Sequence, residues 1–239
     1  MKPESKIASG KTKTVYKLED PSLVLIEFRD DVTALDGRRR DLIEGKGAIN
    51  AAITAKLMQV LNSHGIPTHF VEFRSPSSIV AKKLSMIPLE VVCRNIAAGH
   101  LVKRLPFKEG SPLDPPIVEF YLKDDERGDP MVNARHIVAL KLASFDEVAF
   151  MEETTLKVNE ALKSFLASRG LTLIDFKIEF GRDPSGNLII GDELDPDCMR
   201  IRDVSTGRVL DKDLYRQGKP LNEVLEAYLE CRRRIVEGD

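Results

Sequence analysis

The chain has 239 residues, 42% of them hydrophobic and 31% charged, which is enough for a packed core in one large domain or two small ones. Its formal net charge of -2 argues against a nucleic-acid or membrane surface as the main partner, and no apolar run reaches the length of a membrane span. Three cysteines without a CxxC or Cys/His cluster, and a polar amino terminus without a signal-peptide core, indicate a cytoplasmic location and neither a disulfide framework nor a zinc site.

The first part of the chain is predicted to be rich in strands. One helix interrupts them, and it ends where His64 and Gly65 precede Pro67. The segment 82–88 then leads into a second part. The predicted strands are 14–18, 23–28, 68–73 and 78–82, and the predicted helix is 48–63.

The second part mixes strands and helices without a regular alternation, which favours an α+β fold over a doubly wound sheet. A long helix is expected over 145–168, because Ser144 and Glu147 form a capping box at its start and Gly170 follows its end. A polar loop precedes the closing helix. The other predicted elements are strands at 89–94, 117–122, 171–180 and 188–192, a short helix near Leu101, and the closing helix at 221–236.

The two strands before the polar loop are predicted to form a hairpin, because turn-forming residues separate them. In the first strand Asp175, Lys177 and Glu179 share one face. A turn centred near residues 185–186 places Glu179 opposite Asp192. Two opposed carboxylates repel, so we expect a positive group between them, and hard oxygen ligands suit Mg²⁺. A solvated hairpin with an acidic face is the alternative.

Residues 9–16, SGKTKTVY, combine a glycine with two lysines just before a predicted strand. Gly10 lets the backbone approach a phosphate, and Lys11 and Lys13 offer ammonium donors. The segment is not a Walker A loop, which needs GxxxxGK[ST] at the start of a helix. It indicates either a phosphate site or a surface turn with two solvated lysines.

Residues 90–104, EVVCRNIAAGHLVKR, predict a strand, a loop of small residues and a helix start. Such a turn exposes backbone amides that bind phosphate, and Arg94 can add a bidentate contact. A tight strand-to-helix turn with Arg94 in a structural ion pair is the alternative.

Residues 192–197, DELDPD, carry four carboxylates and precede Arg200 and Arg202. Acidic loops are also common on protein surfaces. Together with the hairpin and the lysine segment, however, this loop favours an enzyme that uses ATP and Mg²⁺. The sequence contains no Ser-His-Asp elbow, HExxH helix or GxGxxG fingerprint.

The chain contains, in this order, the segments GKTKTVY, DGRRRDLIEGKGAIN, EVVCRNIAAGHLVKR, KDDERGDPMVN, LIDFKIEFG, GDELDPDCMR and DKDLYRQ. The same segments occur in the same order in SAICAR synthetases, and they extend from about Ala8 to Arg233. The chain therefore resembles that family of ligases from de novo purine synthesis.

The resemblance implies that the protein joins L-aspartate to carboxyaminoimidazole ribonucleotide in an amide bond, with ATP converted to ADP and phosphate and with Mg²⁺ as cofactor. It implies an α+β fold with an antiparallel, kinase-like ATP lobe over residues 1–85 and a larger substrate- and metal-binding part over residues 86–239. A homo-oligomer without nucleic-acid or membrane partners is expected. ATP lies between the two parts in this family.

Carried over position by position, the resemblance assigns Lys177, Glu179 and Asp192 to catalysis, with Glu179 and Asp192 as the Mg²⁺ ligands. The implied ATP site comprises Gly10, Lys11, Lys13, Val15, Lys82, Leu84 and Met86. The implied ribonucleotide site comprises Arg94, Gly99, His100, Lys123, Asp129, Arg200, Lys212 and Arg216. The candidates for the aspartate site are Asp36, Gly37, Lys46 and Asn50.

Two positions depart from the family's usual pattern, both on the substrate side. His100 stands where the family usually has a serine that helps to hold the substrate phosphate, and Cys198 and Met199 stand where Gly-Ser is common. The alternatives are a small-molecule kinase with the same ATP lobe and a nucleotide-binding regulator without chemistry. The intact Asp175-x-Lys177-x-Glu179 pattern and the downstream Asp192 disfavour the regulator.

Overall fold

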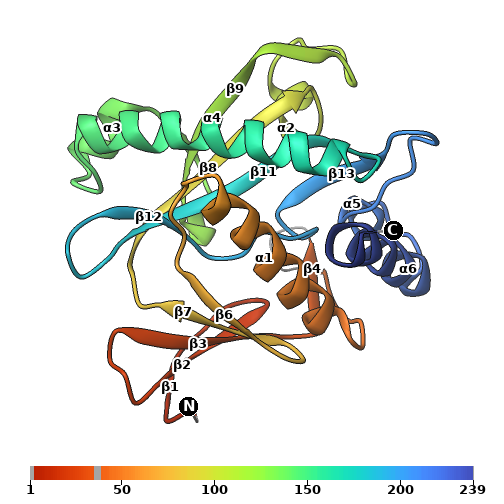
Figure 1. Cartoon of the computed structure of the whole chain (residues 1–239). Helices are drawn as coiled ribbons and strands as arrows, with labels where there is room; N and C mark the ends of the chain where they lie inside the picture. The colour runs from red at the N-terminus through yellow and green to blue at the C-terminus, as the bar shows by residue number, and fades with distance from the viewer. Residues whose placement is uncertain (1–2, 35–38, 239) are drawn as a thin grey trace.

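The computed structural model describes residues 3–34 and 39–238, which form two antiparallel sheets with helices packed against them (Figure 1). The first sheet, low in Figure 1, has the order β1-β2-β3-β7-β6. Its strands are β1 Lys6–Ser9, β2 Lys13–Lys17, β3 Leu23–Phe28, β6 Phe70–Arg74 and β7 Ser78–Lys82. Apolar residues alternate along β3, and Val24, Ile26 and Phe28 are buried, so one face of this sheet contributes to the core.

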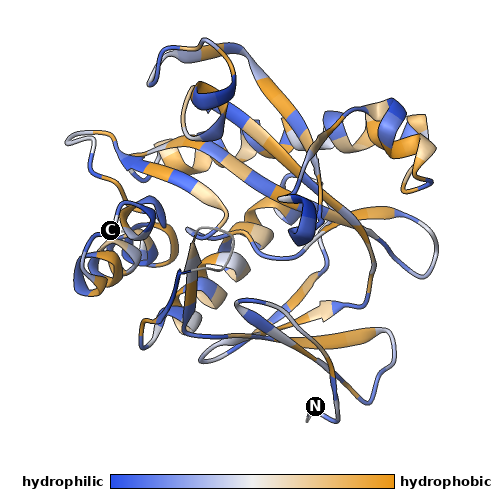
Figure 2. Cartoon of the chain, turned by 180° about the vertical axis from the view of Figure 1, so that it is seen from behind, coloured by the Kyte–Doolittle hydropathy of each residue, from blue (hydrophilic) through white to orange (hydrophobic). Residues whose placement is uncertain are grey.

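The second sheet has the order β10-β9-β8-β11-β12, and β13 also pairs with β11. Its strands are β8 Ser85–Ile96, β9 Pro112–Leu122, β10 Met131–Val132, β11 Leu171–Arg182, β12 Leu188–Gly191 and β13 Met199–Asp203. Because β11 pairs with β8, β12 and β13, its side chains can reach residues on three neighbouring strands. Figure 2 shows orange hydrophobic stretches along the strands of both sheets, interrupted by blue polar residues.

A short hairpin and the helices complete the described structure. The hairpin consists of β4 Asp31–Ala34 and β5 Arg39–Leu42. The helices are α1 Lys46–Ser63, α2 His100–Arg104, α3 Ala134–Ala139, α4 Phe145–Ala167, α5 Asp213–Arg216 and α6 Leu221–Arg232, with a 3-10 turn at Asp125–Arg127 and a π-helical turn at Arg233–Glu237. No helix within the described ranges is long and apolar enough to cross a bilayer.

The central helix α1 joins the two parts of the core. It contacts β3, β6 and β7 of the first sheet and also α4 and α6, while α4 covers β8 and β11 (Figure 1). Ile53, Leu57 and Leu61 of α1 are fully buried. Burial of such side chains on several sides of one helix holds the two sheets in a fixed relation.

The α+β prediction is confirmed, and most predicted elements occur. The capping box of α4 is present, with Ser144 Oγ accepting from the Glu147 amide at 3.1 Å and Glu147 Oε2 accepting from the Ser144 amide at 2.8 Å. Two predictions are wrong. The crossing segment already contains the start of β8, and the polar loop contains β13, in which buried Met199 and Ile201 alternate with Arg200 and Arg202.

The change from one sheet to the other falls between Lys82, the last residue of β7, and Ser85, the first of β8. The two parts are also joined elsewhere, because the His69 amide donates to Ile190 O at 2.8 Å and the Ile190 amide donates to Pro67 O at 3.2 Å. A division into domains at residues 85/86 stays a prediction.

Candidate active site

The β11–β12 hairpin differs from the predicted register by one residue. Glu179 lies opposite Gly191, and the prediction that it faces Asp192 in the ladder is wrong. The reason is the length of the turn. The Asp183 side chain accepts hydrogen bonds from the amides of Ser185 and Asn187, each at 2.9 Å, which closes a turn one residue longer than expected.

Asp192 directly follows the last residue of β12, and its backbone is in the left-handed region with φ +63°. Its carboxylate and that of Glu179 nevertheless contact the same cation. Lys177 Nζ lies 2.8 Å from Glu179 Oε1 and 3.1 Å from Asp192 Oδ2. The expectation of a positive group between the two carboxylates is therefore confirmed, and that group is the Lys177 ammonium.

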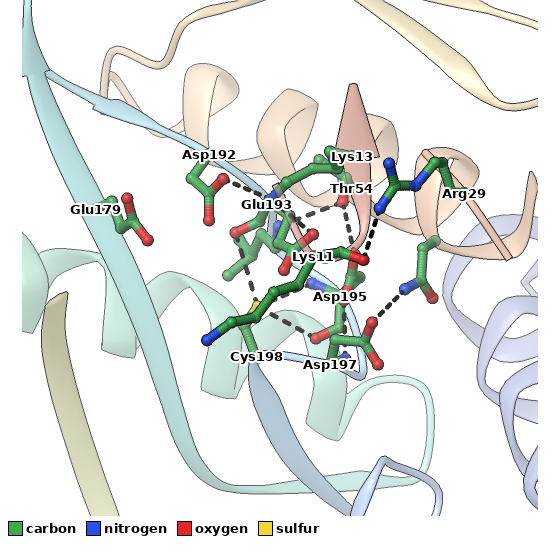
Figure 3. Close-up of polar contacts among 12 residues, drawn as sticks. Lys11, Lys13, Arg29, Thr54, Glu179, Asp192, Glu193, Asp195, Asp197 and Cys198 are labelled. Atoms are coloured by element: carbon green, nitrogen blue, oxygen red, sulfur yellow. Dashed lines mark hydrogen bonds and ion pairs between the residues drawn. The ribbon is translucent and has the colours of Figure 1, made fainter. Parts of the chain in front are cut away.

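Two further lysines complete the pairing of these carboxylates. Lys123 Nζ lies 2.7 and 2.6 Å from the two oxygens of Glu179. Lys13 Nζ lies 2.5 Å from Asp192 Oδ1 and 2.7 Å from Glu193 Oε2 (Figure 3). Every oxygen of Glu179 and Asp192 thus contacts an ammonium group, from β2, from the segment after β9, or from β11.

The electrostatic coupling of this cluster shifts several pKa values. Burial disfavours the Lys177 ammonium, but Glu179 and Asp192 outweigh it and raise the pKa of Lys177 well above its ordinary value. Burial likewise disfavours the Asp192 carboxylate, but Lys13 and Lys177 hold its pKa well below the usual range. Lys177 and Asp192 are therefore both charged at neutral pH.

A cavity of about 570 Å³ opens over this cluster, between the lysine segment of the first sheet and the carboxylates of the second. Its lining residues are Gly10, Lys11, Thr12, Lys13, Thr33, Glu90, Lys123, Asp125, Asp129, Lys177, Glu179, Asp192, Glu193, Asp197, Cys198 and Lys212. It brings together nine of the residues that the sequence assigned to catalysis, ATP or ribonucleotide: Gly10, Lys11, Lys13, Lys123, Asp129, Lys177, Glu179, Asp192 and Lys212.

The lysine segment is held in place by a residue that the sequence did not single out. The Arg29 Nη2 group donates to Gly10 O and Lys11 O, both at 2.8 Å, and Arg29 Nε donates to Asp31 at 2.9 Å. The Gly10 amide donates to Lys13 O at 2.9 Å, which closes a tight turn. Lys11 is more exposed than Lys13 and pairs with Asp125 at 2.7 Å.

The residues expected beside adenine lie at the crossing between the sheets and are not among the residues that line the charged cavity. Leu84 and Met86 pack against the glycines of the β11–β12 hairpin, where a Cβ on Gly181 would lie 2.8 Å from Leu84 Cβ and 3.0 Å from Met86 Sδ. Glycine at 181 therefore allows this apolar surface to approach β11. Val15 and Lys82 lie on β2 and β7.

The three arginines expected at the ribonucleotide, Arg94, Arg200 and Arg216, belong to one ionic network. Arg94 is buried, with Nε donating to Glu119 at 2.7 Å and Nη1 to Asp175 at 3.0 Å. Arg200 donates from Nε to Asp213 at 2.8 Å and from Nη1 to Asp175 at 2.7 Å.

The loop before α2 lies against this network. Gly99 has φ +61°, and a Cβ there would lie 2.5 Å from Arg200 Nη2, so only glycine fits both the backbone and the space. His100 is the first residue of α2 and is exposed. Arg216 Nη1 lies 2.7 Å from Asp213, and Asp129 accepts from the Asp124 amide at 2.8 Å.

The candidates for the aspartate site are only partly described. Asp36 and Gly37 lie outside the described residues. Lys46 is almost fully buried and its Nζ lies 2.6 Å from Asp197 Oδ2, to which Asn50 Nδ2 also donates at 3.2 Å. Both side chains thus hold Asp197, which lines the cavity.

Sequence reasoning missed the other lining residues, namely Thr12, Thr33, Glu90, Asp125, Glu193, Asp197 and Cys198. The acidic loop was singled out as a unit, so Glu193 and Asp197 had a signal. Glu90, Asp125 and Cys198 lie in segments that carry the family resemblance, whereas Thr33 had no signal. Cys198 Sγ contacts backbone oxygens, with Asp195 O at 3.2 Å, and burial raises the pKa of its thiol well above the ordinary value.

The donor set for a metal is limited. Across residues 3–34 and 39–238 no group of three or more His, Cys, Asp or Glu side chains is arranged to hold a metal ion. Glu179 and Asp192 nevertheless supply hard carboxylate oxygens around one cation position, that of Lys177 Nζ, so they fit a hard divalent ion that arrives with further oxygen ligands.

A cleft between two sheets that gathers lysines around paired carboxylates is typical of enzymes that bind the phosphates of a nucleotide. The family model described as SAICAR synthetase matches residues 6–235, and the chain belongs to this family. The chain is 54% identical over 232 residues to the phosphoribosylaminoimidazole-succinocarboxamide synthase of Sulfurisphaera tokodaii, covering 97% of this chain and 98% of the relative. It is 50% identical over 234 residues to the enzyme of the same name from Methanopyrus kandleri, covering 98% and 94%.

Solved structures agree with this membership. A SAICAR synthetase in complex with ADP superposes with a TM-score of 0.93 at 44% identity, covering 97% of this chain and 98% of that one. The SAICAR synthetase of Pyrococcus horikoshii has a TM-score of 0.89 at 44% identity, covering 95% and 98%. The Saccharomyces cerevisiae enzyme, at 19% identity and a TM-score of 0.81 with coverage of 100% and 98%, shares the fold.

Proposed function

We propose that this protein is the ATP-dependent ligase that forms SAICAR, by joining L-aspartate to carboxyaminoimidazole ribonucleotide in an amide bond. The observation that carries the proposal is the position of Lys177 between Glu179 and Asp192, in the wall of a cavity that also includes the Gly10–Lys13 turn. Membership of the SAICAR synthetase family supports the reaction class.

The chemistry requires activation of a carboxylate. Transfer of the γ-phosphoryl group of ATP to a carboxylate oxygen of the ribonucleotide gives an acyl phosphate and ADP. The amine of aspartate then attacks the acyl carbon, loses a proton and displaces phosphate. Phosphoryl transfer asks a protein mainly for positioning and charge neutralisation, so a covalent bond to the protein is unnecessary.

The lysines that pair with carboxylates in this structure can supply the positioning and charge neutralisation that phosphoryl transfer requires. In the proposal, Lys13 binds the phosphates of ATP, held under the Gly10 turn, and Lys177 binds the phosphoryl group in transfer. Arg29 keeps the turn in the position that this requires. Glu179 and Asp192 would hold Mg²⁺, which supplies neutralisation of phosphate charge when bound.

Lys212 is the proposed contact for an anionic group of the ribonucleotide. Among the lysines that line the cavity, it is the one whose side-chain ammonium makes neither a hydrogen bond nor an ion pair within the described ranges. Burial lowers the pKa of Lys212, with a smaller opposing effect of Asp197. A half-buried cation without an ion-pair partner gains most from a bound anion. The contribution of Lys46 and Asn50 to the aspartate site is indirect, through Asp197.

A small-molecule kinase would use the same phosphate site, and dependence on aspartate separates the two reactions. ADP release should require ATP, Mg²⁺, the ribonucleotide and L-aspartate together, in a coupled assay in which each component is omitted in turn. ADP release that continues undiminished without aspartate would contradict the ligase and favour the kinase.

We further propose a cytoplasmic location and a homo-oligomeric assembly. The free thiols of Cys93, Cys198 and Cys231 support a reducing compartment. The half-exposed Phe145 and Phe150 on α4 support an assembly through that helix. Sedimentation of the protein at several concentrations tests the oligomer, and a monomer at micromolar concentration would contradict it.

A further inference from the structure

Asp175 is the middle member of a row of three residues on adjacent strands. On β11 it pairs with Arg94 of β8 and with Arg200 of β13. The pairing with β13 shifts by one residue between Leu173 and Asp175, which is a β-bulge. A bulge re-aims the side chains that follow it, and here it brings Asp175 and Arg200 to the same place.

A single carboxylate oxygen joins the two arginines. Asp175 Oδ2 accepts from Arg94 Nη1 at 3.0 Å and from Arg200 Nη1 at 2.7 Å. The side chains of Asp175 and Arg94 are about 95% buried, with exposed fractions of 5% and 6%. Without this shared oxygen, two like charges would face each other in a poorly solvated place and would separate.

Besides Asp175, a second carboxylate binds the Nε group of each arginine. Glu119 accepts from Arg94 Nε at 2.7 Å, and Asp213 accepts from Arg200 Nε at 2.8 Å. Each arginine is therefore fixed at Nε and Nη1, and its Nη2 is the remaining end. Since a guanidinium is planar and rigid, two fixed nitrogens determine the direction of the third.

Both Nη2 groups keep N–H donors that no close hydrogen bond to a described residue uses. Arg200 Nη2 makes no hydrogen bond with any described residue and lies against the Gly99 loop. Arg94 Nη2 has a long contact of 3.4 Å to the Tyr121 hydroxyl, which leaves it a second N–H. Guanidinium N–H groups of this kind match the oxygens of a phosphate.

We propose that Asp175 is a positioning residue of the reaction, which aims Arg94 and Arg200 at the 5′-phosphate of the ribonucleotide through its shared Oδ2. The inference rests on the proposed function. A purely electrostatic role makes the opposite prediction, because removing a negative charge beside two arginines should tighten the binding of an anion.

The test compares the ribonucleotide with its dephosphorylated nucleoside as substrates of Asp175→Asn. In the wild type, kcat/KM should favour the ribonucleotide strongly. In Asp175→Asn this preference should fall roughly tenfold or more, since misaimed guanidinium groups lose charge-assisted hydrogen bonds to phosphate. The KM for ATP should stay within about twofold. General damage to the fold would lower kcat/KM for both substrates equally and leave the preference unchanged.

Two further variants keep the outcome decisive. Asp175→Glu retains the charge but lengthens the side chain, so it should also lose preference, whereas a charge-only role predicts the wild-type value. Arg200→Gln tests the phosphate site itself. If Arg200→Gln loses the preference and both Asp175 variants keep it, Asp175 has no positioning role, but the assignment of the phosphate site to Arg200 is supported. If Arg200→Gln also keeps it, the assignment of the phosphate site is wrong.

Discussion

The Lys177 ammonium lies 2.8 Å from Oε1 of Glu179, and it also contacts Asp192 at 3.1 Å. These are hydrogen-bonding distances, whereas Mg²⁺ binds oxygen at roughly 2.0–2.1 Å. An ion that takes the place of this ammonium therefore requires the carboxylates to close in and Lys177 to move. Incoming phosphate oxygens give Lys177 a new partner, so metal and nucleotide should bind together.

Metal binding without nucleotide should accordingly be weak in the wild type. Lys177→Met removes the competing ammonium, and we expect this variant to bind Mn²⁺ roughly tenfold more tightly than the wild type in the absence of nucleotide, because two carboxylates lose a cation that they share. Calorimetric titration with Mn²⁺ measures this. Lys157→Met, which changes an exposed lysine of α4, is the matched control. Equal Mn²⁺ affinity in wild type and Lys177→Met would contradict the competition.

Removal of either carboxylate should disable catalysis. Glu179→Gln and Asp192→Asn are each expected to lower kcat by about 100-fold or more, since a metal stabilises several kcal/mol of transition-state charge. Both should also unfold at lower temperature, because buried ammonium groups lose a partner. Glu153→Gln, on the exposed face of α4, serves as control. Near-normal kcat at limiting Mg²⁺ in both variants would mean that the carboxylates serve only structure.

The two lysines of the SGKTKT segment should differ in importance. Lys13 is mostly buried against Asp192 and Glu193, whereas the Lys11 side chain is 49% exposed and pairs with an exposed Asp125. We expect Lys13→Ala to raise the KM for ATP at least tenfold and Lys11→Ala to raise it less, because desolvated charge contacts are stronger. Initial rates measured as a function of the concentration of each substrate give the KM values that test this. A selective rise in the KM for the ribonucleotide would assign the segment to the other ligand.

The sequence predicted β11 well because its pattern is local. Apolar and charged residues alternate from Ile174 to Phe180, and that alternation requires no knowledge of the partner strand. The register was off by one because turn length depends on hydrogen bonds that the Asp183 side chain accepts from backbone amides, which composition does not specify. β13 was missed because its arginines made it resemble a loop, although Met199 and Ile201 alternate inward.

In the charged cluster, the local contacts could be predicted from the sequence and the long-range contacts could not. Lys177 and Glu179 are two residues apart on one strand, so their proximity follows from strand geometry. Lys13 and Lys123 are separated from their carboxylate partners by 179 and 56 residues, and nothing local in the sequence indicates those contacts. The Lys13 contact depends on how the two sheets pack, and the Lys123 contact depends on the order of β9, β8 and β11 in the second sheet.

Stability at acid pH should depend on His69, a buried residue between the two sheets. Burial lowers the pKa of His69 to about 4, with a further lowering by Lys13 that Asp192 opposes, and its Nε2 has no hydrogen-bond partner among the described residues. The unfolded chain binds a proton as the pH falls through about 6.5, and the folded protein does so only near pH 4. Unfolding free energy is therefore lost as the pH falls across this window.

His69→Gln removes this titration, so the dependence of stability on pH between about 6.5 and 4 should flatten by up to about 3 kcal/mol relative to the wild type. Urea unfolding at a series of pH values measures the difference, and carboxylates that titrate in both proteins cancel from it. His64→Gln, at the exposed end of α1, is the matched control and should follow the wild-type curve. Parallel curves for wild type and His69→Gln would mean that His69 accepts its proton in the folded protein as easily as in the unfolded chain, through local opening of the contact between the two sheets.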